Sequence, residues 1–271
     1  MSAPISALTI AGSDPSGGAG LQADLKTFHQ HGVYGMSVVT LVTVQNTQRV
    51  SRVELLPASL VAEQIEAVLQ DVPPACIKLG ALGGADIVDA VIGALAERRV
   101  PLVVDPVMIS KHGAALLDAD AQARMRALIV GAELVTPNGP EAAALTGREV
   151  TSSAQALDAA KAIRDLGAQA VLIKGGHFDE EDASDLLLDE SGEEVFSAPR
   201  VDTKHTHGTG CTYASAISAR LALGHSLRDA VYGAKRWLQR AIVRAPGLGG
   251  GQGPVFHHAS CAGTFPPFDG H

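Results

Sequence analysis

The sequence predicts an α/β protein in which helices cover a mostly parallel β-sheet. Short apolar runs of strand length alternate with longer amphipathic stretches along the 271 residues. The strand candidates are ALTIAG, MSVVTLVTV, CIKLGAL, PLVVDP, AELVTP and AVLIKGG. Their nearly continuous apolar character is typical of strands that are buried on both faces of a parallel sheet.

Helices are expected between and after these strands. They are predicted over residues 18–31, 59–71, 85–98, 119–130, 154–166, 209–223 and 227–244. The last one opens with Ser226 and Asp229, a variant of the capping box. DLLLDESGEEVFSAP differs, because two strand-like runs meet at Ser191 and Gly192 and predict an antiparallel hairpin at the sheet edge. VSRVELLP is a second candidate edge element.

Composition and charge argue against several classes of protein. No linker rich in proline, serine or charge divides the chain, so residues 1–271 are expected to form one domain. Acidic residues outnumber basic ones by 29 to 21, and no basic patch with interleaved aromatic residues points to nucleic acid. The first apolar run ends at Gly12, too early for a signal peptide or a membrane span. A cytosolic protein is therefore expected.

The cysteines are few and scattered. Cys76, Cys211 and Cys261 give an odd count and no C-x-x-C pair, which argues against a disulfide framework and a zinc site. Any cysteine chemistry is therefore expected to come from a single thiol.

Polar residues follow five of the predicted strands. Loops and helix amino termini converge beyond the carboxyl ends of parallel strands, so ligands collect there. One such polar residue can simply solvate a loop, but five together favour a binding site. The residues are Asp14, Gln45 with Asn46, Asp105, Asn138 and Lys174.

The first glycine-rich stretch, GSDPSGGAG at residues 12–20, opens a helix but fits a dinucleotide fingerprint only loosely. Asp14 and Pro15 stand where a pyrophosphate would approach, and no acidic residue about 20 positions later would take a ribose hydroxyl. The sequence contains no G-x-x-x-x-G-K-[ST], which excludes a P-loop. A dehydrogenase is thus the least favoured enzyme class.

The second glycine-rich stretch, THGTGC at residues 206–211, precedes a helix rich in small residues. Its glycines let backbone N–H groups point to one place at the helix amino terminus, which predicts a cradle for a phosphoryl group. Cys211 would lie at the same positive helix end, which is expected to lower the pKa of its thiol. The alternative is that Cys211 is a small buried apolar residue.

Four charged residues have either two interpretations or an implied partner. Asp24 shares a helix face with Leu21 and Phe28, where it either interacts with the helix amino terminus or accepts hydrogen bonds from a substrate. Lys174 ends a buried strand, and a nucleotide phosphate would compensate its charge. Asp105 and Glu141 are candidates to position Mg²⁺, although Glu141 is equally compatible with an exposed first-turn residue.

These stretches resemble the hydroxymethylpyrimidine and phosphomethylpyrimidine kinases of thiamin synthesis, within the ribokinase-like superfamily. The resemblance rests on ALTIAGSDPSGGAGLQADLKTF, VTVQNT, DPVMISKHG, LVTPNGPEAAALTG, VLIKGGH, FSAPRVDTKHTHGTGCTYASAI and GPVFHH. It implies a three-layer sandwich with a central mostly parallel sheet and a small antiparallel edge hairpin. It also implies a homodimer.

The resemblance implies phosphorylation of 4-amino-5-hydroxymethyl-2-methylpyrimidine by ATP, and then of its monophosphate. Asp24 and Gln45 would hydrogen-bond the aminopyrimidine, whose nitrogens offer both donors and acceptors. The other substrate positions would be Gly12, Ala19, Ala81 and Val107. Mg²⁺ would be organised by Asp105 and Glu141. The nucleotide would be bound by Asn138, Lys174, Thr206 and Thr209. The catalytic anion hole would be formed by Gly208, Thr209, Gly210 and Cys211 together with Lys174.

Two positions bear on mechanism and specificity. Many sugar kinases of the superfamily have an aspartate as base where this chain has Cys211, so a thiol would take the hydroxymethyl proton here. The second acceptor is a phosphate monoester that is already largely ionised, so Cys211 is expected to matter more in the first step. The family commonly has methionine in its K-x-G-M-L motif, whereas this chain has Ala81, which would enlarge the pocket.

Two alternatives remain at this point. A pyridoxal or pyridoxine kinase would use a related fold, and Ala81 would help to admit that ring. A nucleotide-binding regulatory protein without catalysis is disfavoured, since such a protein has no chemical need for THGTGC, KGG and DPVM together.

Overall fold

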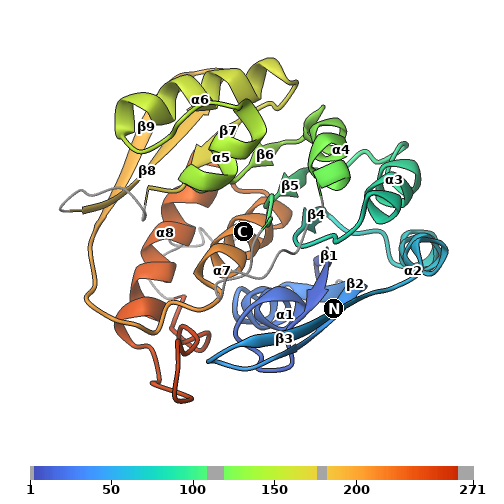
Figure 1. The fold of residues 1–271 in the computed structure, drawn as a ribbon, viewed down its shortest axis with the longest axis horizontal. Coiled ribbons are helices and arrows are strands. Elements are labelled where there is room, and N and C mark those ends of the chain that lie inside the picture. The colour runs from blue at the N-terminus through green and yellow to red at the C-terminus, as the bar shows by residue number, and fades with distance from the viewer. Residues whose placement is uncertain (1–2, 109–118, 176–181, 262–271) are drawn as a thin grey trace.

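A nine-stranded sheet, in the order β3-β2-β1-β4-β5-β6-β7-β8-β9, runs through the computed structural model, which describes residues 3–108, 119–175 and 182–261 (Figure 1). Its central strands are parallel to one another, as the apolar runs predict. They are β1 (Ser6–Ser13), β2 (Tyr34–Gln45), β4 (Cys76–Leu79), β5 (Leu102–Val104), β6 (Leu134–Val135) and β7 (Val171–Ile173).

Both edges of the sheet are antiparallel. At one edge β3 (Val50–Leu55) pairs with β2, which confirms the strand predicted from VSRVELLP. At the other edge β8 (Asp182–Asp189) pairs with β7 and turns back into β9 (Gly192–Pro199). The predicted hairpin at Ser191 and Gly192 is therefore confirmed.

Helices form a layer on each face of the sheet. One layer holds α1 (Gly20–Gln30), α7 (Thr209–Ala222) and α8 (Leu227–Val243), as Figure 1 shows. The other holds α2 (Ala58–Asp71), α3 (Ala85–Ala94), α4 (Ala119–Ile129), α5 (Gly139–Thr146) and α6 (Ser153–Asp165). Successive strand residues supply the two layers in turn, so Ile77 belongs to one apolar cluster and Cys76 to the other. The predicted three-layer sandwich is confirmed.

Helix α5 is not among the helices predicted from the sequence. Asn138 is its N-cap, and a complete capping box links Asn138 and Glu141, with Pro140 in the first turn. The capping box in TPNGPE is the sequence signal that marks the start of this helix. Glu141 is buried rather than exposed, because α5 packs its first turn toward the sheet.

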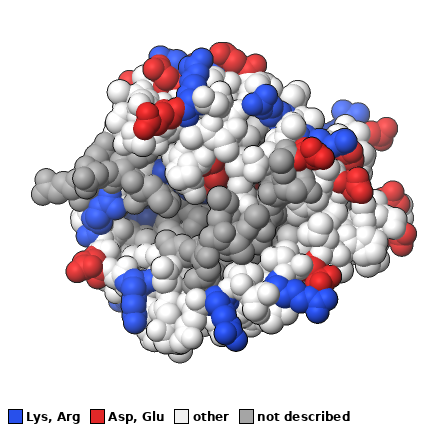
Figure 2. All heavy atoms as spheres, in the orientation of Figure 1, with Lys and Arg blue, Asp and Glu red and all other residues white. Residues whose placement is uncertain are grey.

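The surface carries charges of both signs. Basic and acidic side chains lie around the periphery of the face shown in Figure 2. None of the helices in the described part of the chain is long and apolar enough to cross a membrane. The assignment of residues 1–271 to one domain stays a prediction.

A buried histidine links α1 to α8. His31 follows α1, and its Nδ1–H donates to the Thr27 carbonyl at 2.9 Å. Its ring meets the ring of Trp237 edge-on, with the centroids 4.7 Å apart. Burial lowers the pKa of His31 from 6.5 to about 4.

We expect this histidine to make folding stability depend on pH. Its contribution is complete above pH 6.5 and is lost as the pH falls toward 4, by up to roughly 3 kcal/mol, because only the unfolded chain binds the proton readily. In His31→Asn, which keeps a donor for Thr27, the free energy of unfolding should fall less steeply over this range. Urea unfolding monitored by Trp237 fluorescence measures both slopes. Equal slopes would contradict the assignment to His31. Both proteins keep some pH dependence, because His257, whose pKa is also lowered to about 4, is present in both.

Candidate active site

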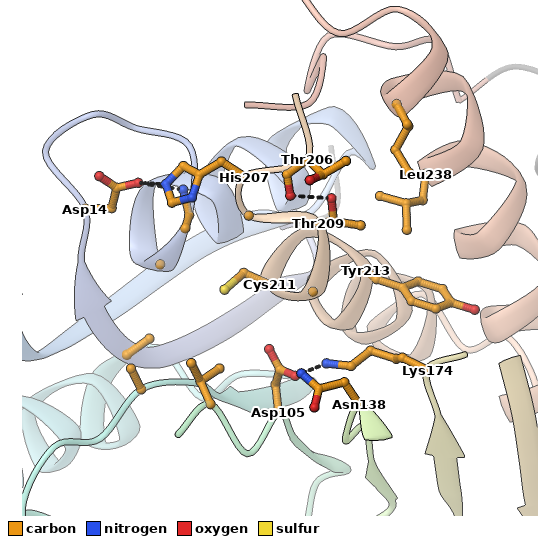
Figure 3. A pocket seen from close by; sticks show the side chains of 18 of the residues that line it. Asp14, Asp105, Asn138, Lys174, Thr206, His207, Thr209, Cys211, Tyr213 and Leu238 are labelled. Carbon is orange, nitrogen blue, oxygen red and sulfur yellow. Dashed lines mark hydrogen bonds and ion pairs between the residues drawn. The ribbon is translucent and has the colours of Figure 1, made fainter. Parts of the chain in front are cut away.

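A cavity of about 430 Å³ lies at the carboxyl ends of the parallel strands. Strand-end residues from β1, β2, β5, β6 and β7 reach its wall, as the alternation of strands and polar residues predicts. These are Asp14, Gln45, Asp105, Asn138 and Lys174, several of which are labelled in Figure 3. Asn46 does not take part, since its side chain accepts hydrogen bonds from Gln48 and Arg49 in a turn.

The structure brings almost every predicted site residue to this cavity. Its lining includes Gly12, Ala19, Gln45, Ala81, Asp105, Val107, Asn138, Glu141, Lys174, Thr206, Gly208, Thr209, Gly210 and Cys211. Asp24 and Asn46 are the exceptions. The stretches at 109–113 and 176–177, which contributed to the resemblance, lie outside the described residues.

Lys174 ties two carboxylates together at one side of the cavity. Its Nζ donates to Asp105 Oδ1 at 2.8 Å and lies 3.7 Å from Glu141 Oε2. Burial by itself would lower the pKa of Lys174, but the charges of Asp105 and Glu141 outweigh burial and raise it. The lysine therefore stays charged, and Lys174 and Lys78 in turn hold the pKa of Asp105 below its usual range despite burial.

The two carboxylates fit a divalent cation. Asp105 Oδ2 is buried and accepts no hydrogen bond from the described residues, so a lone pair remains for a ligand. Burial raises the pKa of Glu141 to about 7, because the charge of Lys174, which lowers it, is partly offset by repulsion from Asp105; a divalent cation would favour the ionised carboxylate further. Within the described residues, no three His, Cys, Asp or Glu side chains gather as a metal site. Phosphate oxygens and water would have to complete the coordination, which is the usual manner for Mg²⁺.

The amino terminus of α7 opens into the cavity. Its N-cap, Gly208, has φ +76° and supplies no side chain to the first N–H groups of the helix. Thr209 Oγ1 donates to the Thr206 carbonyl at 2.7 Å, which folds the loop onto the first turn (Figure 3). Thr209 N–H also donates to the Thr206 carbonyl, at 3.3 Å, so the next N–H groups of the first turn, together with the helix dipole, make this end suited to an anion.

Asp14 joins the two glycine-rich loops. Its Oδ2 accepts hydrogen bonds from His207 Nε2 at 2.8 Å and from the backbone N–H groups of Gly18 and Ala19 at 3.1 and 2.8 Å. Its Oδ1 accepts from the backbone and side chain of Ser16. Burial opposes ionisation of Asp14, but these bonds, led by that from His207, keep its pKa below the ordinary value.

Cys211 lies in the first turn of α7, partly exposed to the cavity. Burial raises the pKa of its thiol to about 11, and the opposing charge of Lys78 does not compensate. The predicted lowering was wrong, because desolvation outweighs the nearby cation and the helix end. At pH 7 only on the order of one thiol in 10⁴ is ionised at such a pKa.

Asp24 faces the core instead of the cavity. Its carboxylate accepts hydrogen bonds from Thr9 Oγ1 at 2.6 Å, Lys78 Nζ at 2.9 Å and Ser215 Oγ at 2.6 Å. The predicted inward face of α1 is correct, since Leu21 and Phe28 are also buried. That face packs against the sheet and α7, so the predicted contact of Asp24 with substrate is not supported.

Sequence reasoning missed several residues of the lining. Lys78 stands in an apolar strand, and this contrast within CIKLGAL was the available signal. Lys235 Nζ donates to Asp185 Oδ2 at 2.6 Å and lies 5.9 Å from the centre of the Tyr213 ring. Asp185, Tyr213 and Lys235 come from β8, α7 and α8, so no local sequence pattern could have predicted that they meet.

The fold and this cavity together define a kinase for a small molecule, since a helix amino terminus, a charged lysine and two acidic side chains converge on one space. Residues 14–256 match the family model described as phosphomethylpyrimidine kinase. The chain belongs to this family.

Relatives agree with this membership. The chain is 47% identical to the thiamine biosynthesis bifunctional protein ThiED of Geobacter sulfurreducens, over 93% of this chain but only 52% of that protein. It is 43% identical to the hydroxymethylpyrimidine/phosphomethylpyrimidine kinase of Staphylococcus aureus, over 94% of each. The solved structure of the Staphylococcus aureus pyridoxal kinase in complex with AMP-PCP and pyridoxal is 35% identical, with a TM-score of 0.87 over 95% of each chain.

The contact between the two glycine-rich loops predicts the effect of a single methyl group. In Gly208→Ala the new Cβ would lie 1.8 Å from the Gly18 carbonyl oxygen, so the loop at the start of α7 must move. We expect at least tenfold weaker binding of AMP-PCP by calorimetry, which is about 1.4 kcal/mol. Gly224→Ala is the matched control, because its φ is also positive, +85°, but its Cβ would meet nothing within 4 Å. Both variants lose stability through strained backbone, and equal affinities for AMP-PCP would refute the loop argument.

Proposed function

We propose that this chain transfers the γ-phosphoryl group of ATP to 4-amino-5-hydroxymethyl-2-methylpyrimidine and then to its monophosphate. Membership in the phosphomethylpyrimidine kinase family and the names of its relatives support this proposal. The observation that carries it is a single cavity in which Cys211 lies between polar groups suited to a pyrimidine and groups suited to phosphates.

The pyrimidine would bind at the β1 and β2 side of the cavity. Gln45 offers a carboxamide that both donates and accepts hydrogen bonds, as an aminopyrimidine ring requires. Gly12, Ala19, Ala81 and Val107 leave room for the ring beside it. Asp24 does not line this cavity, and its carboxylate is held by Thr9, Lys78 and Ser215.

The nucleotide phosphates would bind where Lys174 and α7 meet. Lys174, Asn138, Thr206 and Thr209 supply donors, and the first N–H groups of α7 face the transferred phosphoryl group. Asp105 and Glu141 would hold Mg²⁺, which when bound neutralises charge on the phosphate oxygens. The apolar side chains of Val201, Leu238 and Ile242, further along the cavity, suit the adenine ring.

The proposed chemistry is a direct phosphoryl transfer. The hydroxymethyl oxygen bonds to the γ-phosphorus, the bond from that phosphorus to the β–γ bridging oxygen breaks, and ADP leaves with the electron pair. The hydroxyl proton goes to Cys211 when the thiol is ionised. Positioning and charge stabilisation supply most of the rate, because the thiolate is scarce.

A second candidate function is phosphorylation of pyridoxal. The TM-score of 0.87 with a pyridoxal kinase and the small side chain of Ala81 favour it. The identity of 43 to 47% with the pyrimidine-kinase and ThiED relatives, against 35% with that pyridoxal kinase, favours the pyrimidine. The homodimer and the cytosolic location stay predictions.

The assignment predicts which acceptors are used. With Mg²⁺ and ATP, we expect ADP release with the hydroxymethylpyrimidine and with its monophosphate, measured by a coupled assay and product chromatography. Chelation of Mg²⁺ should abolish both reactions. Turnover of pyridoxal alone would transfer the chain to the second candidate function, and no turnover of any acceptor would refute a kinase role.

Cys211→Ala separates the two steps. We expect kcat for the hydroxymethyl acceptor to fall by roughly 10² or more, the range for loss of a proton acceptor. The reaction of the monophosphate should fall much less, since that acceptor is already largely ionised near neutral pH. Cys211→Ser serves as the comparison of similar size. Equal losses in the two steps would show that the thiol acts by packing and not as a base.

A further inference from the structure

Asp24 and Lys78 form an ion pair deep inside the protein, between α1 and β4. Both side chains are fully buried, and Lys78 Nζ lies 2.9 Å from Asp24 Oδ2. Thr9 from β1 donates to the same oxygen, and Ser215 from α7 donates to the other. Side chains from three elements, β1, β4 and α7, thus hold one carboxylate of α1.

Core packing alone does not account for this pair. Removing two charges from water costs several kcal/mol per ion, and apolar side chains of similar volume often stabilise a core equally well. The hydrogen bonds of Thr9 and Ser215 offset part of the cost for Asp24. Because Lys78 is buried at this cost and lines the cavity, we expect it to act on a group in that cavity.

Both residues of the pair are close enough to Cys211 to act on its charge. Ser215 follows Cys211 by four residues in α7, so the two side chains are on one face of the helix, a turn apart. Lys78 lines the same cavity as Cys211 and Asp105. Gly80 keeps this space open, since a Cβ there would lie 2.9 Å from Lys78 Nζ. An ammonium has three donors, and Asp24 takes one of them.

Charges from several neighbouring elements act on Cys211, among them Lys174 at the end of β7, whose pKa Cys211 in turn helps to raise. Lys78 from β4 is the strongest charge that favours its thiolate, and the backbone N–H of Gly20 at the start of α1 adds to it. Asp105, beyond β5, and Asp24 act in the opposite direction. Burial by itself would lower the pKa of Lys78, but Asp24, followed by Cys211 and Asp105, raises it, so the ammonium stays charged.

We propose that Lys78, held by Asp24, is a positioning residue that acts through Cys211. Its fixed positive charge stabilises the Cys211 thiolate, and Asp24 moderates that charge while keeping the ammonium in place. When the thiolate takes the hydroxyl proton of the acceptor, Lys78 keeps its own protons. The kinetic consequence rests on the proposed function, but the effect on the thiol does not.

Alkylation of Cys211 by iodoacetamide tests the proposal without any substrate. Only the thiolate reacts, so the rate as a function of pH, measured by mass spectrometry of the Cys211 peptide, reports the pKa of the thiol. We expect Lys78→Met to slow alkylation at pH 8 at least tenfold, and Asp24→Asn to accelerate it. Cys261 in the same samples is the internal reference.

The opposite signs distinguish an electrostatic role from a structural one. Both substitutions break the same ion pair and destabilise the core, so a structural role would move the two rates in the same direction and would overturn the proposal. Lys235→Met is a matched control, because it removes the cation of another buried pair on the same cavity, with Asp185, and should leave the alkylation rate unchanged.

Loss of folding in a single variant does not prevent the test. The double variant Asp24→Asn with Lys78→Met has no buried charge at this place, so it should regain stability, measured by circular dichroism, and still show slow alkylation. Rapid alkylation of Cys211 in the double variant would overturn the proposal.

The kinase assay adds a separate readout. Lys78→Met should lower kcat for the hydroxymethyl acceptor at least tenfold and affect the monophosphate less. An active wild type with unchanged alkylation in all variants would refute only the role of Lys78. An inactive wild type with the expected alkylation pattern would refute only the proposed function.

Discussion

The geometry of the site depends on the hydrogen bonds that the Asp14 carboxylate accepts. This carboxylate follows β1, accepts N–H groups from its own glycine-rich loop and binds His207 from a segment almost 200 residues later. Because a buried carboxylate needs these bonds, the loop before α1 and the loop before α7 hold each other in place. The cavity then has a fixed wall on which Gly208 and Cys211 are presented.

Buried charges of alternating sign line the rest of the site and lie next to it in the core. Asp24 pairs with Lys78, and Asp105 pairs with Lys174. Removing one partner of either pair would destabilise the fold, because the other partner would be left as an unpaired charge in a low-dielectric interior. An arrangement of this kind suits phosphoryl transfer, where negative charge enters and leaves the same space and the protein must not reorganise. Cys211 lies within this field, so its ionisation depends on residues from three other elements.

Much of the fold and of the site followed from local patterns. Apolar runs predicted the parallel strands, and polar residues at their ends predicted the wall of the cavity, because parallel strands share one carboxyl edge. Two properties of individual side chains depended on the tertiary structure. Asp24 lies on the predicted face of α1, but the direction of that face depends on how α1 packs against α7. The pKa of Cys211 depends on burial, which spacing along the chain does not reveal.

The sequence by itself determined the alternation of elements, the glycine-rich loop at the start of α7, and the residue types at the strand ends, since these depend on neighbours within a few positions. Only the tertiary structure decided which charges meet. His207 finds Asp14 and Lys78 finds Asp24 across layers of the sandwich. The physical reason is that Coulomb energies depend on distances in space and solvation energies depend on burial. Neither distance nor burial can be deduced from the local sequence.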